Sequence, residues 1–442
     1  MSAIRNALYR AARLTDRFHV LVVILISPVF LFPSPSRVPL FLLVPAFWLV
    51  RRFADKPQLP RTPLDGVLFV LGLTVCISLV ATPDIVFSLP KVAGLVFGLV
   101  LYYGIVRTLR NKSQFWWAMH VFILCGAGLA VIALLGTNWL DKVPVLRTVT
   151  AHLPRAIRGL PGAEEGFSAN AVGGSLLLFI PLQLVLLGNS LSGRSDFFDG
   201  PRALWPPGVW RAAYFAAALL SGGVLVLTQS RGAWLALGAS STALLAWHGP
   251  RSRRCLAILL LVVAVIVLLG WRWVFPIVSI QMDDNMESNV VGRVEIWSRA
   301  IEGIRDFPYT GMGMNMFRRV MPLLYPSFTI SPEFDIAHCH SQFLQVALDL
   351  GLAGLVAYTA LWLQVAYLLV YVFRKAHSPW IRDVASGLGA GLIAQFLFGI
   401  SDAIPLGAKV GVLFWFDLAL AVSAFSLVHT ERHPSGALRL RF

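Results

Sequence analysis

The 442-residue sequence predicts an all-α, polytopic integral membrane protein with about twelve transmembrane helices. Hydrophobic residues make up 57% of the chain and charged residues 13%, roughly half the charged share of a soluble domain. Apolar runs long enough to cross a bilayer also recur along the whole chain. The net charge of +15 does not indicate nucleic-acid binding, because the basic residues lie in short clusters between these runs.

The apolar runs define the predicted spans, all within a single transmembrane domain over residues 1–442. A helix that crosses a bilayer needs about 20 apolar residues. The predicted spans are 18–33, 38–50, 64–82, 88–106, 114–136, 169–188, 211–229, 232–248, 255–275, 341–373, 384–401 and 407–428. The second is short and contains Pro45, whereas the tenth is long enough to extend beyond the bilayer.

Basic residues between the spans predict the orientation of the chain. Lys and Arg are enriched in the cytoplasmic segments of membrane proteins. Four arginines precede the first span, and every second connection after it is also basic: Arg51 and Arg52, Arg107 and Arg110, Arg194 and Arg202, Arg251 and Arg253, Arg374 and Lys375, and Arg432 in the tail. We therefore expect both termini in the cytoplasm.

Two of the predicted external segments are long. One covers residues 137–168, and the other is a large loop at 276–340 between the ninth and tenth spans. The large loop has five arginines against eight acidic residues, so it lacks the charge balance of a cytoplasmic loop. Within it, Val294, Trp297, Ile301 and Ile304 recur at three- and four-residue spacing. This spacing predicts an amphipathic helix that lies on the bundle or at the membrane interface.

Three arginines fall on the predicted outer face. Arg231 lies in the short turn Thr228-Gln229-Ser230-Arg231-Gly232 between two spans, Arg293 opens the amphipathic helix, and Arg158 precedes the sixth span. Each has an ordinary interpretation as a snorkelling or solvated charge. The alternative is a binding site for phosphate oxygens, because a guanidinium offers a rigid, permanently charged fork of donors.

His340 opens the tenth span and has three interpretations. It is a hydrogen-bonded residue at a helix start, or half of a His338-x-His340 metal pair completed by Glu333 or Asp335, or a base that acts on a hydroxyl group. The spacing of these residues does not decide among the three.

Two acidic residues accompany His340 on the predicted outer side. Asp349 lies inside the tenth apolar run and is a candidate functional acid, and Asp402 at the outer end of the eleventh span is a lesser candidate. Gly351 follows His340 by eleven residues, about three helical turns, and Gly354 follows it. We expect these glycines to let a neighbouring helix pack closely beneath the histidine.

At these residues the sequence resembles the O-antigen ligase family, which is related to the O-antigen polymerases. The turn 228–232 is similar to the Ser-Arg-Gly turn of the family, and 292–297 with Pro308 and Gly311-Met312-Gly313 is similar to the stretch around its second arginine. His340-Ser341, nine residues, Gly351, two residues and Gly354 fit the histidine pattern of the ligases. Asn170 matches more loosely, because the preceding residues depart from the usual Gly-Thr-Phe turn.

The resemblance implies a GT-C-like glycosyltransferase of lipopolysaccharide biosynthesis in the bacterial inner membrane, with a periplasmic active site. It would transfer O-antigen from undecaprenyl diphosphate to lipid A–core with inversion, without a metal or other cofactor. Arg231 and Arg293 would bind the diphosphate, and His340 would be catalytic. Secondary candidates are Arg158, His338, Asn170 and Asp349. Membrane lipids are further expected partners, and nucleic acid is not.

Other functions remain open from the sequence. One is an O-antigen polymerase or another glycan transferase that uses undecaprenyl diphosphate, including one that glycosylates protein. The glycine-spaced histidine pattern favours the ligase. A secondary transporter also commonly has twelve spans, but transporters place their binding sites near the bilayer midplane, whereas the charged candidates here gather on one face.

Overall fold

The computed structural model describes residues 19–43, 60–160, 163–192, 206–247, 290–328, 330 and 335–433, with a few single positions between 253 and 265. These residues are almost entirely helical. The helices are α2 (His19–Leu31), α4 (Asp65–Ala81), α5 (Ile85–Thr108), α6 (Lys112–Gly136), α7 (Pro144–Thr150), α8 (Ala169–Leu176), α9 (Ile180–Leu191), α10 (Pro207–Leu227), α11 (Arg231–Trp247), α14 (Val290–Asp306), α15 (Phe317–Leu324), α16 (Gln342–Lys375), α17 (Pro379–Ser401) and α18 (Val412–Arg432). Two 3-10 helices, η1 (Pro35–Leu42) and η4 (Lys409–Gly411), and two strands, β1 (Thr137–Asn138) and β2 (Phe167–Ser168), complete the described elements.

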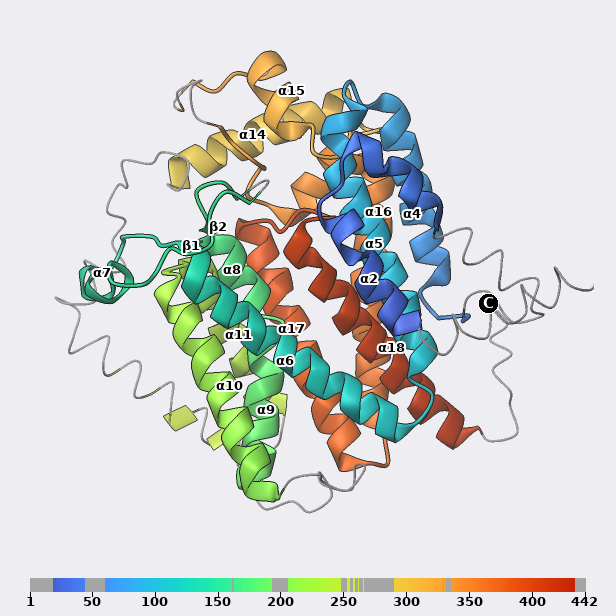
Figure 1. The fold of residues 1–442 in the computed structure, drawn as a ribbon, viewed down its shortest axis with the longest axis vertical. Helices are drawn as coiled ribbons and strands as arrows, with labels where there is room; N and C mark the ends of the chain where they lie inside the picture. Colours follow the sequence, from blue (N-terminus) through green and yellow to red (C-terminus); the bar gives the residue numbers. More distant parts are fainter. Residues whose placement is uncertain are drawn as a thin grey trace, which may run out of the picture.

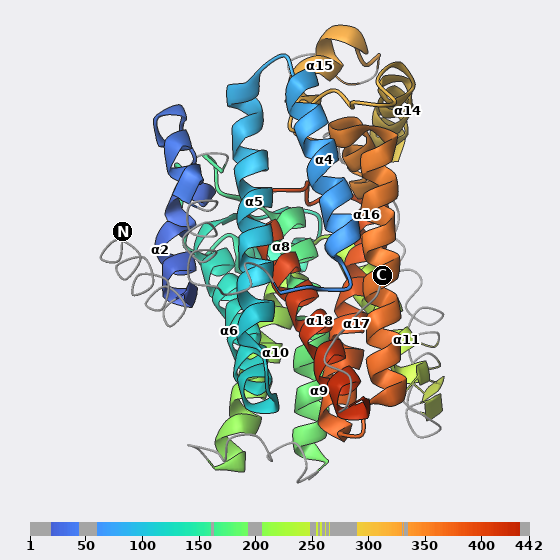
Figure 2. The ribbon, with the colours of Figure 1, turned by 90° about the vertical axis from the view of Figure 1, so that its right-hand side faces the viewer.

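The long helices form a bundle, and α14 and α15 lie together at one end of it (Figure 1). In the view turned by 90°, α4, α5 and α16 run along the bundle toward the same end (Figure 2). The two short strands pair in parallel, with Thr137 opposite Phe167 and Asn138 opposite Ser168. This pairing joins the beginning and the end of the predicted external segment 137–168.

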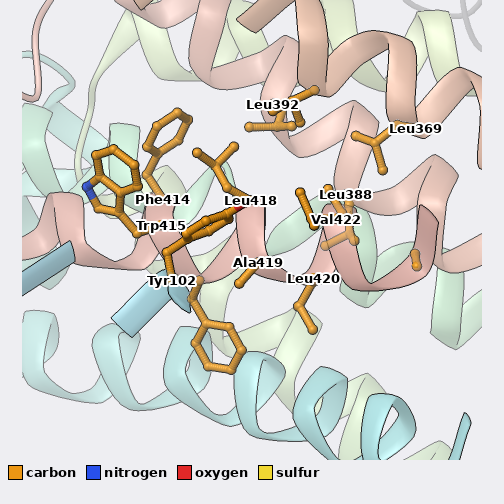
Figure 3. Close-up of a cluster of buried hydrophobic side chains, with 14 of the residues drawn as sticks. Tyr102, Leu369, Leu388, Leu392, Phe414, Trp415, Leu418, Ala419, Leu420 and Val422 are labelled. Atoms are coloured by element: carbon orange, nitrogen blue, oxygen red, sulfur yellow. The ribbon is translucent and has the colours of Figure 1, made fainter. Parts of the chain in front are cut away.

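Helix α18 is the central element of the bundle and packs against α5, α16, α17 and α6. The five consecutive residues Leu418 to Val422 are all at most 1% exposed, and Asp417 before them is also fully buried. Because consecutive helical residues are about 100° apart, these residues cover every side of the helix, so neighbouring helices enclose α18. Figure 3 shows these residues meeting Tyr102 of α5 and leucines of α16 and α17.

Six of the described helices are long and apolar enough to cross a membrane: α5, α6, α10, α16, α17 and the η4–α18 unit. The pair α8 and α9 makes a seventh candidate if its 41° bend belongs to one span. Helices α2 and α4 are apolar but shorter. The chain is therefore a polytopic, all-helical membrane protein, as predicted.

The number twelve stays a prediction. Residues 255–275, the predicted ninth span, lie largely outside the described residues. The predicted second span, 38–50, begins in the 3-10 helix η1, and most of it also lies outside them. The predicted eighth span corresponds to α11, which has only 17 residues.

Helix α16 is broken at Gly351, which corrects the expectation of one continuous helical face below His340. The backbone of Gly351 has φ 71° and ψ −178°, outside the helical region and in the range that favours glycine. The segment after α14 fills the break: Leu352 N donates to Pro308 O at 2.7 Å, and Met312 N donates to Leu348 O at 2.6 Å. A Cβ atom at Gly351 would lie 2.6 Å from Tyr309 O. The glycine therefore receives a loop, not a neighbouring helix.

The buried face of α14 also differs from the predicted one. Val294 is 55% exposed and Ile301 is 43% exposed, although both belong to the predicted apolar stripe. Ile296 and Ala300 are buried instead. Apolar residues occur on two sides of this helix, so their spacing did not determine which side turns inward. The inward side is the one that carries Arg293, three residues before Ile296.

Candidate active site

The candidate site is centred on the end of α17, where Ser401 and Asp402 are approached by three other parts of the chain. The side chain of Asp402 is 5% exposed. Its Oδ1 lies 3.2 Å from Nδ1 of His340, and its Oδ2 lies 3.7 Å from Nη2 of Arg293. Arg293 also donates from Nη1 to the carbonyl oxygen of Ser401 at 2.6 Å. Helix α14 and the turn directly before α16 thus meet at one carboxylate.

His340 occupies a strained turn directly before α16. Its φ is 49°, a conformation that a side chain with a Cβ atom rarely adopts. Neighbours hold the turn: the indole N–H of Trp297 donates to His340 O at 3.3 Å, and the ring of His338 lies 4.6 Å from the His340 ring, centre to centre. The imidazole side chain is 12% exposed. Non-glycine residues in this conformation often mark functional sites.

The ionisation of Asp402 determines which nitrogen of His340 is basic. Burial disfavours the carboxylate, but the hydrogen bond from His340 and the charges of His340, His338 and Arg293 outweigh it and lower the pKa of Asp402 to about 2. An ionised carboxylate only accepts hydrogen bonds. Nδ1 of His340 therefore carries a hydrogen, and in the neutral ring the lone pair is on Nε2.

The turn that carries Arg231 adjoins the same end of α17. A Cβ atom on Gly232 would lie 3.1 Å from Ser401 Oγ, so the turn and Ser401 are in direct contact. Gln229, with φ 51°, anchors the other side of the turn: its Oε1 accepts from Lys142 N and Val143 N, each at 2.7 Å. The side chain of Arg231 is half-buried and has no hydrogen bond or ion pair within the part of the chain that the structure describes.

The secondary candidates lie at different distances from this centre. His338 is in it, and Asn170 is the second residue of α8, a helix that packs on the Arg231 turn through Gly173. Arg158 is exposed, and among the described residues it forms no hydrogen bond or ion pair with this centre. Asp349 is buried in α16, where its carboxylate accepts from Gln345 and from the backbone of Asn315 and does not reach Asp402.

Comparison with known proteins identifies the family of one part of the chain. Residues 216–359 match the family model described as O-antigen ligase. This segment is an O-antigen ligase family domain. It runs from α10 into the first half of α16 and includes Arg231, Arg293 and His340. The family assignment made from the motifs is confirmed. No curated protein matches the chain.

Asp402 is the residue that sequence reasoning ranked too low. It lies outside the matched segment of the O-antigen ligase family, 62 residues after His340, and no motif surrounds it. The available signal was its position at the outer end of a predicted span, where a buried acid needs a partner. Only the packing of α17 against α11 and α16 shows that its partners are the candidate residues themselves.

A metal at this centre would use the two predicted histidines with a different acid, Asp402. Ligand atoms of His338, His340 and Asp402 lie within 4.8 Å of one another. Asp335 instead forms an ion pair with Arg318 at 2.6 Å, and Glu333 lies outside the described residues. The guanidinium of Arg293 adjoins the same carboxylate, and its positive charge opposes a divalent cation there. The three groups therefore fit a hydrogen-bonded histidine better than a metal.

Proposed function

We propose that the protein transfers O-antigen polysaccharide from undecaprenyl diphosphate to a sugar of lipid A–core, with inversion and without a metal. The observation that carries this proposal is the meeting of His340, Arg293 and the Arg231 turn at Ser401–Asp402, within a segment of the O-antigen ligase family. These groups suit a reaction in which a hydroxyl attacks and a diphosphate departs.

On the acceptor side, His340 serves as the base. Nε2 takes the proton of the acceptor hydroxyl as its oxygen forms a bond to the anomeric carbon of the donor sugar. The bond from that carbon to the diphosphate oxygen breaks on the opposite face, and the electron pair leaves with the diphosphate. Asp402 holds the protonated Nδ1 and stabilises the imidazolium that results.

On the donor side, the arginines neutralise the diphosphate. Arg231 is the principal ligand, because its guanidinium has no protein partner within the described residues. Arg293, whose guanidinium lies 3.7 Å from Asp402, contributes a second positive charge. Fixed positive charges that face a developing anion are among the strongest catalytic effects available to an enzyme without a metal.

A cavity between α16, α17 and α18 supports a lipid-linked donor. It is lined by aromatic rings, among them Phe343, Trp362, Phe396 and Phe414, and by Gln342 two residues after His340. Phe396 is 38% exposed on the outside of the bundle, where lipid would lie. We propose that the first isoprene units of the donor occupy this cavity.

The proposed placement is the bacterial inner membrane, with both termini in the cytoplasm and the Ser401–Asp402 centre at the periplasmic face. It includes the twelve spans and the GT-C-like architecture expected from the sequence. The basic connections on one side and the candidate residues on the other support this orientation.

The decisive experiment replaces His340 in a strain that lacks the chromosomal gene. His340→Ala should insert into the membrane normally and lower transfer to lipid A–core by roughly 10²- to 10⁴-fold, the usual contribution of a general base. His152→Ala, in the exposed segment after α7, is the matched control and should be active. Unchanged capped lipopolysaccharide in the His340→Ala strain would contradict the assigned role.

The lipid carrier of the same strain separates a ligase from a polymerase. Loss of a ligase leaves long glycan on undecaprenyl diphosphate. Loss of a polymerase instead leaves single repeat units attached to lipid A–core. Finding the second pattern would move the proposal from ligase to polymerase while leaving the site residues in place.

A further inference from the structure

A chain of buried hydrogen bonds connects the His340 turn to the break in α16. The backbone N–H of Cys339 donates to Oε1 of Gln345 at 3.0 Å, and Nε2 of Gln345 donates to Oδ1 of Asp349 at 3.0 Å. The backbone N–H of Asn315 donates to the same Oδ1 at 3.3 Å. Cys339, Gln345 and Asp349 are each at most 2% exposed. No proposed catalytic step uses these groups.

The donor-to-acceptor direction of these hydrogen bonds is fixed at both ends of the series. A backbone N–H can only donate, so Asn315 makes Oδ1 of Asp349 an acceptor, and Cys339 requires an acceptor at Gln345. Gln345 therefore has one possible orientation, with its NH2 group toward Asp349 and its oxygen toward Cys339. A flipped amide would set two donors against each other at Cys339 and two acceptors against each other at Asp349, and each buried group left unpaired costs about 1–3 kcal/mol.

Asp349, at the far end of this hydrogen-bond series, is anchored to a different part of the bundle. The hydroxyl of Ser78 in α4 donates to the carbonyl oxygen of Asp349 at 2.6 Å and accepts from Met314 N at 3.0 Å. Asp349 is thus held by α4 and by the loop that fills the break at Gly351. A shift of Asp349 would have to disturb both contacts.

Cys339, at the near end of the hydrogen-bond series, directly precedes the strained His340. Gln345 holds the peptide N–H of the residue directly before His340, whose φ of 49° is unfavourable for a histidine. Without that contact, the turn loses a restraint on the backbone conformation that directs the imidazole toward Asp402. Small displacements of a catalytic group are costly, on the order of 10²-fold in rate for about 1 Å.

We propose that Gln345, oriented by Asp349, is a positioning residue that holds His340 in its reactive conformation. The proposal rests on the assigned role of His340 in the proposed function. It places Asp349, a candidate from the sequence, in a supporting role at a distance from the reacting atoms.

The first test is Gln345→Met in the full-length protein, purified into lipid nanodiscs and assayed with lipid-linked glycan and lipid A–core. Methionine keeps the length of the side chain and removes both hydrogen bonds. We expect kcat to fall on the order of 10²-fold, with the KM for the lipid-linked glycan unchanged because the arginines are untouched. Unchanged kcat would overturn the proposal.

Gln364→Met is the matched control. Gln364 lies on the same helix, and its Oε1 is buried without a hydrogen-bond partner among the described residues. Its replacement should leave kcat unchanged. An equal fall of kcat in Gln364→Met would show that α16 tolerates no such change, and would overturn a specific role for Gln345.

The second test removes the acceptor that orients the amide. Asp349→Leu has a side chain of similar size and no acceptor, so its kcat should fall on the order of 10²-fold. Asp349→Asn, the conservative variant, keeps a carbonyl oxygen that can accept from both Gln345 Nε2 and Asn315 N, so its kcat should be at least ten-fold higher than that of Asp349→Leu. Equal kcat values for Asp349→Leu and Asp349→Asn would overturn the proposal, even if Gln345→Met fails to fold.

His340→Ala separates failure of this proposal from failure of the proposed function. If His340→Ala is inactive while Gln345→Met is fully active, only the positioning role is wrong. If His340→Ala is fully active, the proposed function has lost its base, and a positioning role for Gln345 is excluded with it.

Discussion

The two arginines of the candidate site differ in whether their guanidinium groups already have partners within the folded protein. Arg293 donates to Ser401 O and faces the buried carboxylate of Asp402, so its guanidinium is part of the folded structure. Arg231 lies beside the same residue through Gly232, yet it has no partner within the described residues. The difference indicates that Arg231 is available to an anionic ligand, whereas Arg293 also maintains the site in the absence of one.

Replacement of Arg231 is expected to have the larger effect on activity. Arg231→Ala should lower transfer by roughly 10²- to 10³-fold, since it removes a preorganised charge that faces the leaving group. Arg231→Lys should recover little, because a single ammonium cannot reproduce a bidentate contact with phosphate. Transfer to lipid A–core by the purified protein is the measurement.

The control for Arg231 is an arginine in the segment 137–168 with no role in the site. Arg147 is 69% exposed and pairs with Asp141. Arg147→Ala should have normal activity. If Arg231→Ala were as active as Arg147→Ala, the two arginines would not differ as proposed, and the diphosphate site would have to lie elsewhere.

Replacement of Arg293 is expected to have the larger effect on stability. Arg293→Ala removes the permanently charged partner of the buried Asp402 carboxylate and leaves it with histidines alone, which should destabilise the fold by about 1–3 kcal/mol. Thermal unfolding in nanodiscs should show a lower Tm for Arg293→Ala and an unchanged Tm for Arg231→Ala. Equal Tm values for these two variants would remove the distinction.

Asp402→Asn sharpens this stability comparison. The pKa of Asp402 is lowered to about 2, so the stability from its ionisation is present above the ordinary carboxyl pKa of about 3.9 and is lost as pH falls through about 2. At neutral pH the carboxylate is therefore charged. Combining Asp402→Asn with Arg293→Ala should restore part of the Tm, because no buried charge remains unpaired.

Chelation is expected to have the smallest effect. His338, His340 and Asp402 are close enough to bind a cation after a small movement, but Arg293 opposes it. Prolonged treatment with EDTA should leave transfer unchanged, and subsequent addition of Zn²⁺ or Mg²⁺ should not raise it. Activity that disappears on chelation and returns with one particular ion would make the histidines metal ligands.

Local sequence was sufficient for the membrane class and for the family of the segment that contains the motifs. Each of these depends on composition over a short window or on residues that lie close together in the chain: the apolar runs, the Ser-Arg-Gly turn at 230–232 and the spacing from His340 to Gly351. Such signals do not require knowledge of which helices are neighbours.

Tertiary structure alone decided how these pieces form a site. Asp402 and His340 are 62 residues apart, and Arg293 and Ser401 are 108 apart, so packing of separate helices creates both contacts. The helix break at Gly351 and the inward side of α14 were likewise undetermined, because an apolar pattern with two possible faces is resolved only by what it packs against. The sequence identified candidate residues, whereas the buried carboxylate of Asp402 beside His340 and Arg293 required the fold, since a lone acid has no signature until its partners surround it.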